Sequence, residues 1–213
     1  AINISASHCV TVFYPMFTRR RFLSTLATTT ALSACSRFDG QWLYPCKADG
    51  LPIELAQHDR VQALCEGIDA TQVWDSHVHL MGLGDSPSNI YINPGMQSWL
   101  HPILRVQFHF YMNAACAESK KTVDESVIVA LQQRAMELPI GMKAMLLAFD
   151  AWHNEDGKMD KAATSFYVPN DYAARCAQMM PQRFEWIASI HPYRIDAVEQ
   201  LNDCARRGAR AVK

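Results

Sequence analysis

The feature of the sequence that most constrains the fold is an alternation of strand-like and helix-like segments that begins near residue 65. Apolar runs of strand length lie at 73–80, 142–149, 184–190 and 209–213. Apolar residues at helical spacing lie between them, at 102–116, 122–138, 170–181 and 194–207. Strands that alternate with helices in this way pair in parallel. We therefore predict an α/β fold with a parallel sheet of four strands.

Several of these helices carry their own start signals. Thr122 and Glu125 match the capping box, and Asn170 or Asp171 is placed to cap the helix that ends before Pro181. The last helix has an apolar face made of Ile195, Val198, Leu201 and Ala205. The aromatic-rich helix at 102–116, which His101 precedes and which contains His109, is expected to lie in the core.

The loop after the first strand distinguishes between two α/β architectures. It lacks the GxGxxG motif that a dinucleotide-binding fold places there. A long excursion with His and Trp residues follows instead, which suits a barrel whose site is built by loops at the C-terminal ends of its strands. We expect residues 65–213 to form the first half, about four β/α units, of a TIM-like (β/α)8 barrel cut at strand 4, after a linker and short helix at 35–64.

The composition excludes several classes of protein. The chain has 20 basic and 21 acidic residues, which excludes a nucleic-acid binder that works by bulk charge. No apolar run is long enough for an ordinary membrane span. The seven cysteines show no CxxC spacing, so most are expected to be buried, and one pair could form in an oxidising compartment. The sequence leaves the oligomeric state open.

His77 and His79 are the strongest candidates for catalytic chemistry. On a strand, residues two apart point to the same face, so both imidazoles can reach one metal ion. Zinc binds imidazole nitrogens at about 2.0–2.1 Å. Asp75 lies two residues earlier on the same face, where a buried carboxylate could support the two ligands from behind. The alternative is a pair of core histidines whose hydrogen bonds are satisfied.

Other polar residues follow the second and third predicted strands. His191 ends the third strand at the site face, where it either contacts substrate or makes a loop hydrogen bond. Asp150, His153 and Asp156 follow the second strand. His153 could contact substrate at the mouth of the barrel, although the pattern favours a solvated loop for all three.

Two segments resemble the amidohydrolase superfamily. Residues 75–80, DSHVHL, resemble the D-x-H-x-H signature that opens its barrel, and 183–213 is similar to the third strand, helix and fourth strand of the amidohydrolase-related, metal-dependent TIM-barrel hydrolases. The resemblance covers about residues 65–213. It implies that His77 and His79 bind a divalent metal, usually zinc, which activates water to attack a carbonyl or related carbon of a small-molecule substrate. It places the remaining ligands and the catalytic base, an Asp on strand 8, beyond residue 213.

The same resemblance draws attention to Lys213. In binuclear members a Lys on strand 4 carries CO2 as a carbamate that bridges two metals, so one or two ions could bind. Lys213 ends the fourth predicted strand while Val212 faces the other way, so its side chain could enter the barrel mouth. Alternatively, Lys213 is a plain cation that pairs with a carboxylate or contacts substrate.

Three other functions stay open at this point. A decarboxylase of the same superfamily would share the histidine pair, and so would a phosphoesterase that opens with HxH. A non-catalytic, lipid-anchored binding domain would need no metal. Because a half barrel has open edges, we expect it to be inactive and poorly stable alone.

The N-terminal region has two export signatures in order. Residues 18–23, which include Arg19 and Arg20, resemble a bacterial twin-arginine signal, and residues 32–35, LSAC, resemble a lipobox. We expect residues 1–34 to be an upstream segment and export signal, with translation starting at Met16 and acylation at Cys35. The protein would then be exported to the cell envelope or periplasm and would touch the membrane only through its lipid anchor.

Overall fold

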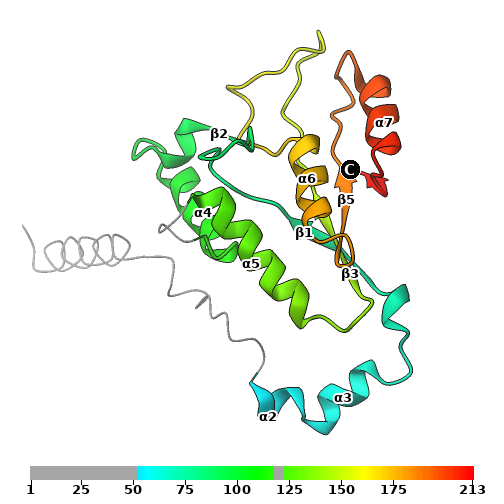
Figure 1. Ribbon diagram of the computed structural model, residues 1–213. Helices are drawn as coiled ribbons and strands as arrows, with labels where there is room; N and C mark the ends of the chain where they lie inside the picture. The colour runs from blue at the N-terminus through cyan, green and yellow to red at the C-terminus, as the bar shows by residue number, and fades with distance from the viewer. Residues whose placement is uncertain (1–51, 118–121) are drawn as a thin grey trace, which may run out of the picture. The chain divides into compact units, whose positions relative to one another are not determined.

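The computed structural model describes residues 52–117 and 122–213 (Figure 1). All of these residues belong to one compact unit. The predictions for Met16, Arg19, Arg20 and Cys35 fall outside the described residues. No helix among the residues described here is long and apolar enough to cross a membrane.

A parallel sheet of four strands forms the centre of the described unit. Its strands are β1 (Trp74–His79), β3 (Lys143–Leu147), β5 (Phe184–Ala188) and β6 (Ala211–Val212). They lie in the order β1-β3-β5-β6, and every neighbouring pair is parallel. The sheet is curled, and its shape is compatible with a partial β/α barrel. The prediction of an α/β fold with four parallel strands is therefore confirmed.

The predicted helices connect these strands. They are α4 (Pro102–Ala114), α5 (Val123–Glu137), α6 (Asn170–Met179) and α7 (Ala197–Arg206). Before β1, α3 (Asp59–Cys65) matches the predicted short helix and follows α2 (Ile53–Ala56). The sequence did not indicate the 3-10 helices η2 (Ala70–Gln72) and η3 (Pro94–Gln97), or the two-residue strands β2 (Tyr91–Ile92) and β4 (Phe166–Tyr167). Elements this short contain too few residues to show a period.

The main core lies on the outer face of the sheet, against α5 and α6. Alternate residues of β3 and β5 belong to it, which are Ala144, Leu146, Phe184, Trp186 and Ala188. The other face carries a smaller buried cluster of Met145, Leu147 and Ile187. Side chains alternate between the faces of a strand, so both faces of β3 and β5 are largely apolar, apart from Lys143 and Glu185, as in buried parallel strands. Two of the seven cysteines, Cys176 and Cys204, are free and buried, while Cys116 is disulfide-bonded.

Two expectations about the helices, for the burial of α4 and for the start of α6, were wrong. None of the residues of α4 is buried, so the aromatic-rich helix does not lie in the core. The apolar face of α7 is also uncovered, with Val198 72% exposed. α6 begins after Pro169 without a side-chain cap, because Asn170 instead uses its amide to bind the backbone of Ser189 after β5. That pair of bonds ties the start of α6 to the C-terminal end of the sheet.

Candidate functional site

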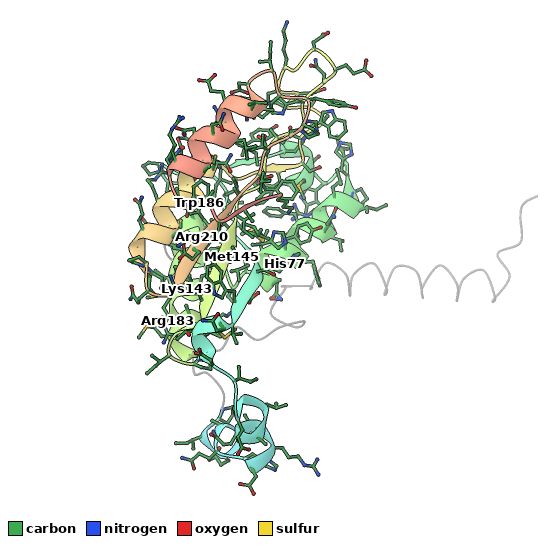
Figure 2. All side chains as sticks on the ribbon, turned by 90° about the vertical axis from the view of Figure 1, so that its right-hand side faces the viewer. His77, Lys143, Met145, Arg183, Trp186 and Arg210 are labelled. Atoms are coloured by element: carbon green, nitrogen blue, oxygen red, sulfur yellow. The ribbon has the colours of Figure 1, made fainter. Side chains whose placement is uncertain are left out.

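The two histidines of β1 converge at the C-terminal end of the strand. Their Nε2 atoms lie 2.9 Å apart and their ring centroids 4.8 Å apart. β1 is held in the sheet by parallel pairing with β3, in which His79 lies opposite Leu147. The two imidazoles therefore lie on one face of β1, as expected for residues two apart on a strand (Figure 2, where His77 is labelled).

The two Nε2 atoms lie at hydrogen-bond distance, closer than a shared metal ion would hold them. Two nitrogens bound to tetrahedral zinc at about 2.1 Å would be about 3.4 Å apart, slightly more than in the structure. Rotation of the rings by a small amount would open that gap. A metal ligand must be a neutral imidazole. Partial burial lowers the pKa of His79, and the charges of Lys213 and His77 lower it further, which favours the neutral form.

Asp75 is exposed, not buried as expected. It also does not share the face of His79, because a register shift in β1 puts Asp75 opposite Ala144 of the main core and His79 opposite Leu147 of the other face. Its Oδ1 accepts a hydrogen bond from the backbone N–H of His77 at 3.1 Å. This bond fixes the backbone that carries the first imidazole. Asp75 therefore supports the pair through the main chain, whereas the sequence suggested support through the ligand rings.

A cavity of about 810 Å³ borders the pair. Asp75, His77, His79, Asp150 and His191 contribute polar groups to its wall. The apolar lining includes Phe108, Tyr111, Leu131, Phe149, Trp152 and Phe166. A volume of this size accommodates a small organic molecule, and the few polar groups in an apolar wall are typical of ligand sites.

Of the two additional histidines, only His191 lines this cavity. Its ring centroid lies 5.2 Å from that of Trp152 and 5.6 Å from that of Tyr193. His153 is only 6% exposed, and its Nδ1 lies 2.9 Å from the carbonyl oxygen of Ala151. The ring of His153 packs behind His191, with 5.4 Å between centroids. The solvated-loop interpretation of His153 was therefore wrong.

Asp150 was also expected in a solvated loop, yet its side chain is only 4% exposed. Its carboxylate accepts hydrogen bonds from the backbone N–H groups of Ala151 and His191, at 2.9 and 2.8 Å. Arg194 pairs with it at 3.2 Å. Asp150 thus ties the segment after β3 to the segment after β5 and holds His191 at the cavity. Its position directly after an apolar strand was the only sequence signal for this role.

Lys213 lies at the C-terminal end of β6. Its backbone N–H donates to the carbonyl of Ala188 at 2.8 Å, and its Nζ lies 4.3 Å from the centre of the Phe149 ring. Burial lowers the pKa of its ammonium group. The charge of Lys213 contributes to the lowered pKa of His79, but its side chain is not among those that line the cavity, so its entry into the barrel mouth stays a prediction.

A buried carboxylate that the sequence did not reveal holds the loop after β1. Asp124, at the start of α5, is 1% exposed. It accepts hydrogen bonds from the N–H groups of Leu83 and Gly84 and the hydroxyls of Ser86 and Ser88, at 2.6–3.1 Å. In return, the carboxylate of Asp85, in the same loop, accepts from the first two amides of α5. This exchange fixes the loop that follows the histidine pair.

Within the described parts of the chain, no third His, Cys, Asp or Glu joins His77 and His79 in a metal-ligand group. Comparisons with protein-family models, curated proteins and solved structures find no match to this chain.

Proposed function

We propose that the chain provides the metal-binding part of a metal-dependent hydrolase of the amidohydrolase type, built on a TIM-like barrel. The observation that carries the proposal is the convergence of two imidazole Nε2 atoms, 2.9 Å apart, beside a cavity of about 810 Å³. Their place at the C-terminal end of a parallel strand supports it, because that edge is where barrels of this kind build their sites.

Each residue of the site has a separate role in this proposal. His77 and His79 would hold a divalent metal, with zinc as the expected ion, and Asp75 fixes the main chain of the first ligand. The bound ion would lower the pKa of a water molecule to about 7. His191 faces the cavity and can contact a small-molecule substrate, with Asp150 holding its backbone. We assign the catalytic base to none of the described residues.

The test is zinc binding by the full chain and by His77→Ala and His79→Ala. Each variant removes one of two ligands, so the affinity for zinc should fall at least about 100-fold. His101→Ala is the control, because His101 is exposed and lies outside the cavity lining. Zinc content after dialysis is measured at matched circular dichroism. Full occupancy in both variants would make the pair ordinary structural histidines.

The same measurement decides the role of Lys213. A carbamate forms on a neutral amine, and burial already lowers the pKa of this one. Two ions per chain in bicarbonate, falling to one or none in Lys213→Ala, would support a bridging carbamate. One ion per chain, unaffected by bicarbonate or by the substitution, would leave Lys213 as a positive charge over the Phe149 ring.

We propose further that the protein is exported and lipid-anchored through Cys35, on the basis of the two N-terminal signatures. Cell fractionation provides the measurement. Arg19→Lys with Arg20→Lys should block export, and Cys35→Ala should release the protein from the membrane fraction. Unchanged fractionation of either variant contradicts the corresponding signature.

A further inference from the structure

Helix α4 carries an uncovered row of apolar side chains. Ile103, Val106 and Phe110 follow one another at helical spacing along one side of the helix, and all three are exposed, with Ile103 at 81% and Val106 at 70%. Trp99 and Leu100, in the turn before α4, are exposed as well. We call these five side chains the α4 stripe. Contiguous exposed apolar surface of this kind marks an interaction site.

The α4 stripe does not face the cavity. The residues of α4 that border the cavity include Gln107, Phe108 and Tyr111. At 3.6 residues per turn, these three are centred about a third of a turn away from the stripe. Because β1 borders the same cavity, strands added beside β1 would approach α4 from the cavity side and leave the stripe uncovered. A further part of the barrel sheet therefore does not explain the stripe.

The segment that contains the stripe has a positive charge. The chain has 21 acidic residues, yet none lies at 86–117, a range that includes all of α4. Arg105 is the one Lys or Arg residue in that range. Its guanidinium lies over the ring of Trp99, 3.8 Å from the ring centre, and donates to the carbonyl of Gln97 at 2.8 Å. A negatively charged surface would therefore attract this segment, and no carboxylate within it would oppose the attraction.

From these features we infer that α4 binds the surface of an anionic lipid bilayer. The helix would lie in the plane of the interface, with the stripe at the boundary of the acyl chains and Arg105 at the level of the headgroups. Trp99 suits this position, because indole rings concentrate at the membrane–water interface. With 13 residues, α4 is too short to span a bilayer, so it would lie on the membrane and not across it.

The observations favour a lipid surface over a protein partner. A stable protein interface takes about 20–30 residues from each side, whereas the stripe consists of five residues on one helix and the turn before it. A lipid surface needs only an apolar row beside groups that tolerate anionic headgroups. The inference depends neither on the proposed metal site nor on acylation of Cys35, and the experiment excludes a contribution from either.

The experiment uses the full chain with Cys35→Ala and without added metal, so that no acyl anchor contributes. The probe is vesicles of phosphatidylcholine with about one third phosphatidylglycerol, whose brominated acyl chains quench indole fluorescence. The Trp99 signal is the difference between this chain and one that also carries Trp99→Phe. That difference reports on α4 even if another segment holds the chain at the vesicle. We expect the vesicles to quench about half or more of it, since the ring would reach the acyl boundary.

A charge placed in the stripe should prevent this quenching. Val106→Glu should raise the lipid concentration for half-maximal quenching at least about tenfold, because the carboxylate would lose its hydration and would be repelled by the anionic lipid. Val198→Glu is the matched control. Val198 is 72% exposed, as Val106 is 70% exposed, and it lies on α7, on the opposite side of the sheet from α4 (Figure 1). This variant should behave like the parent chain.

Four results would overturn the inference. They are a Trp99 signal that the vesicles leave unquenched, equal effects of Val106→Glu and Val198→Glu, quenching that is as strong in vesicles of phosphatidylcholine alone, and a dimer without vesicles that Val106→Glu dissociates. The last result, measured by sedimentation equilibrium, would assign the stripe to a second copy of the chain. Far-UV circular dichroism checks that each variant is folded.

Discussion

Asp124 shows how one side chain can position the loop after the candidate ligands. Burial by itself raises the pKa of its carboxyl, but hydrogen bonds from two serine hydroxyls and two loop amides outweigh burial, and the net pKa is lowered. The four donors come from residues 36 to 41 positions away in the sequence. Because the loop directly follows His79 and Leu80, the carboxylate stabilises the wall of the site as well as the fold.

Asp124→Asn should lower the free energy of unfolding by about 2–4 kcal/mol, because the amide cannot accept from all four donors and leaves buried groups unpaired. Urea unfolding at neutral pH is the measurement. Glu125→Gln is the control, since Glu125 is the exposed neighbour on the same helix turn. Equal stability of the two variants would mean that the loop finds other partners.

Single residues were predictable from sequence only where local spacing determined their geometry. The histidine pair was found because two residues on one strand face must lie together. The sequence missed or misassigned Asp124, Asp150 and His153. The first two are buried by partners from distant segments, and His153 is buried by a bond within its own loop. Residue type alone favours exposure for such groups, and the folded environment overrides it.

At the scale of elements, periodicity located the strands and helices but did not predict what covers them. The four parallel strands were apolar runs, and the four connecting helices had an apolar spacing and recognisable boundaries. The aromatic-rich α4 has no buried residue, and the apolar face predicted for α7 is uncovered at Val198 and Leu201. A period shows which residues share a face, whereas burial depends on a partner element that the period does not identify.

Gly84, in the loop between β1 and α5, provides a test at this scale, with Gly67, which precedes β1, as its reference. Gly84 and Gly67 both have positive φ, +74° and +76°, so alanine at either position costs about 1 kcal/mol. A Cβ at Gly84 would also lie 2.2 Å from the carbonyl oxygen of Ile90, whereas a Cβ at Gly67 meets nothing within 4 Å. Gly84→Ala should therefore destabilise by at least about 2 kcal/mol more than Gly67→Ala.

Chemical denaturation of the two alanine variants gives that difference directly, with each glycine serving as the control for the other. Equal costs would show that the loop moves away from Ile90 without loss. If Gly84→Ala also weakens zinc binding, the loop positions the histidine pair in addition to stabilising the fold.

Across the whole described unit, the inner face of the sheet changes character from one end to the other. Lys143, Glu185 and Arg210 form one ion-paired group, Met145 lies opposite Glu185 in the neighbouring strand, and the histidine pair lies at the C-terminal end of β1 (Lys143, Met145, Arg210 and His77 are labelled in Figure 2). The alternation of strands and helices predicted this α/β architecture. The charged group was not predictable, because it joins three strands whose neighbours are set only by the sheet order.

Glu185 is the centre of that charged group and provides a test of the assembled sheet. It accepts from Lys143 at 2.7 Å and from Arg210 at 3.0 Å, and its side chain is 13% exposed. The hydrogen bond from Arg210 is the largest cause that lowers the Glu185 pKa, and Lys143 adds to it against the opposing effect of burial. A lowered folded-state pKa stabilises the fold above the unfolded pKa, and this stabilisation is lost as the pH falls through the folded value.

We therefore expect Glu185→Gln to lower the free energy of unfolding by about 1–2 kcal/mol at pH 7, where both cations lose a charged partner. The difference from the parent chain should shrink as the pH falls below the ordinary pKa of glutamate, because the parent carboxylate then becomes protonated and neutral as well. Urea unfolding at a series of pH values measures this, with the exposed Glu199→Gln as the control that should show no such trend. A difference that is constant with pH would assign the contribution of Glu185 to packing, and would show that β3, β5 and β6 are not joined electrostatically.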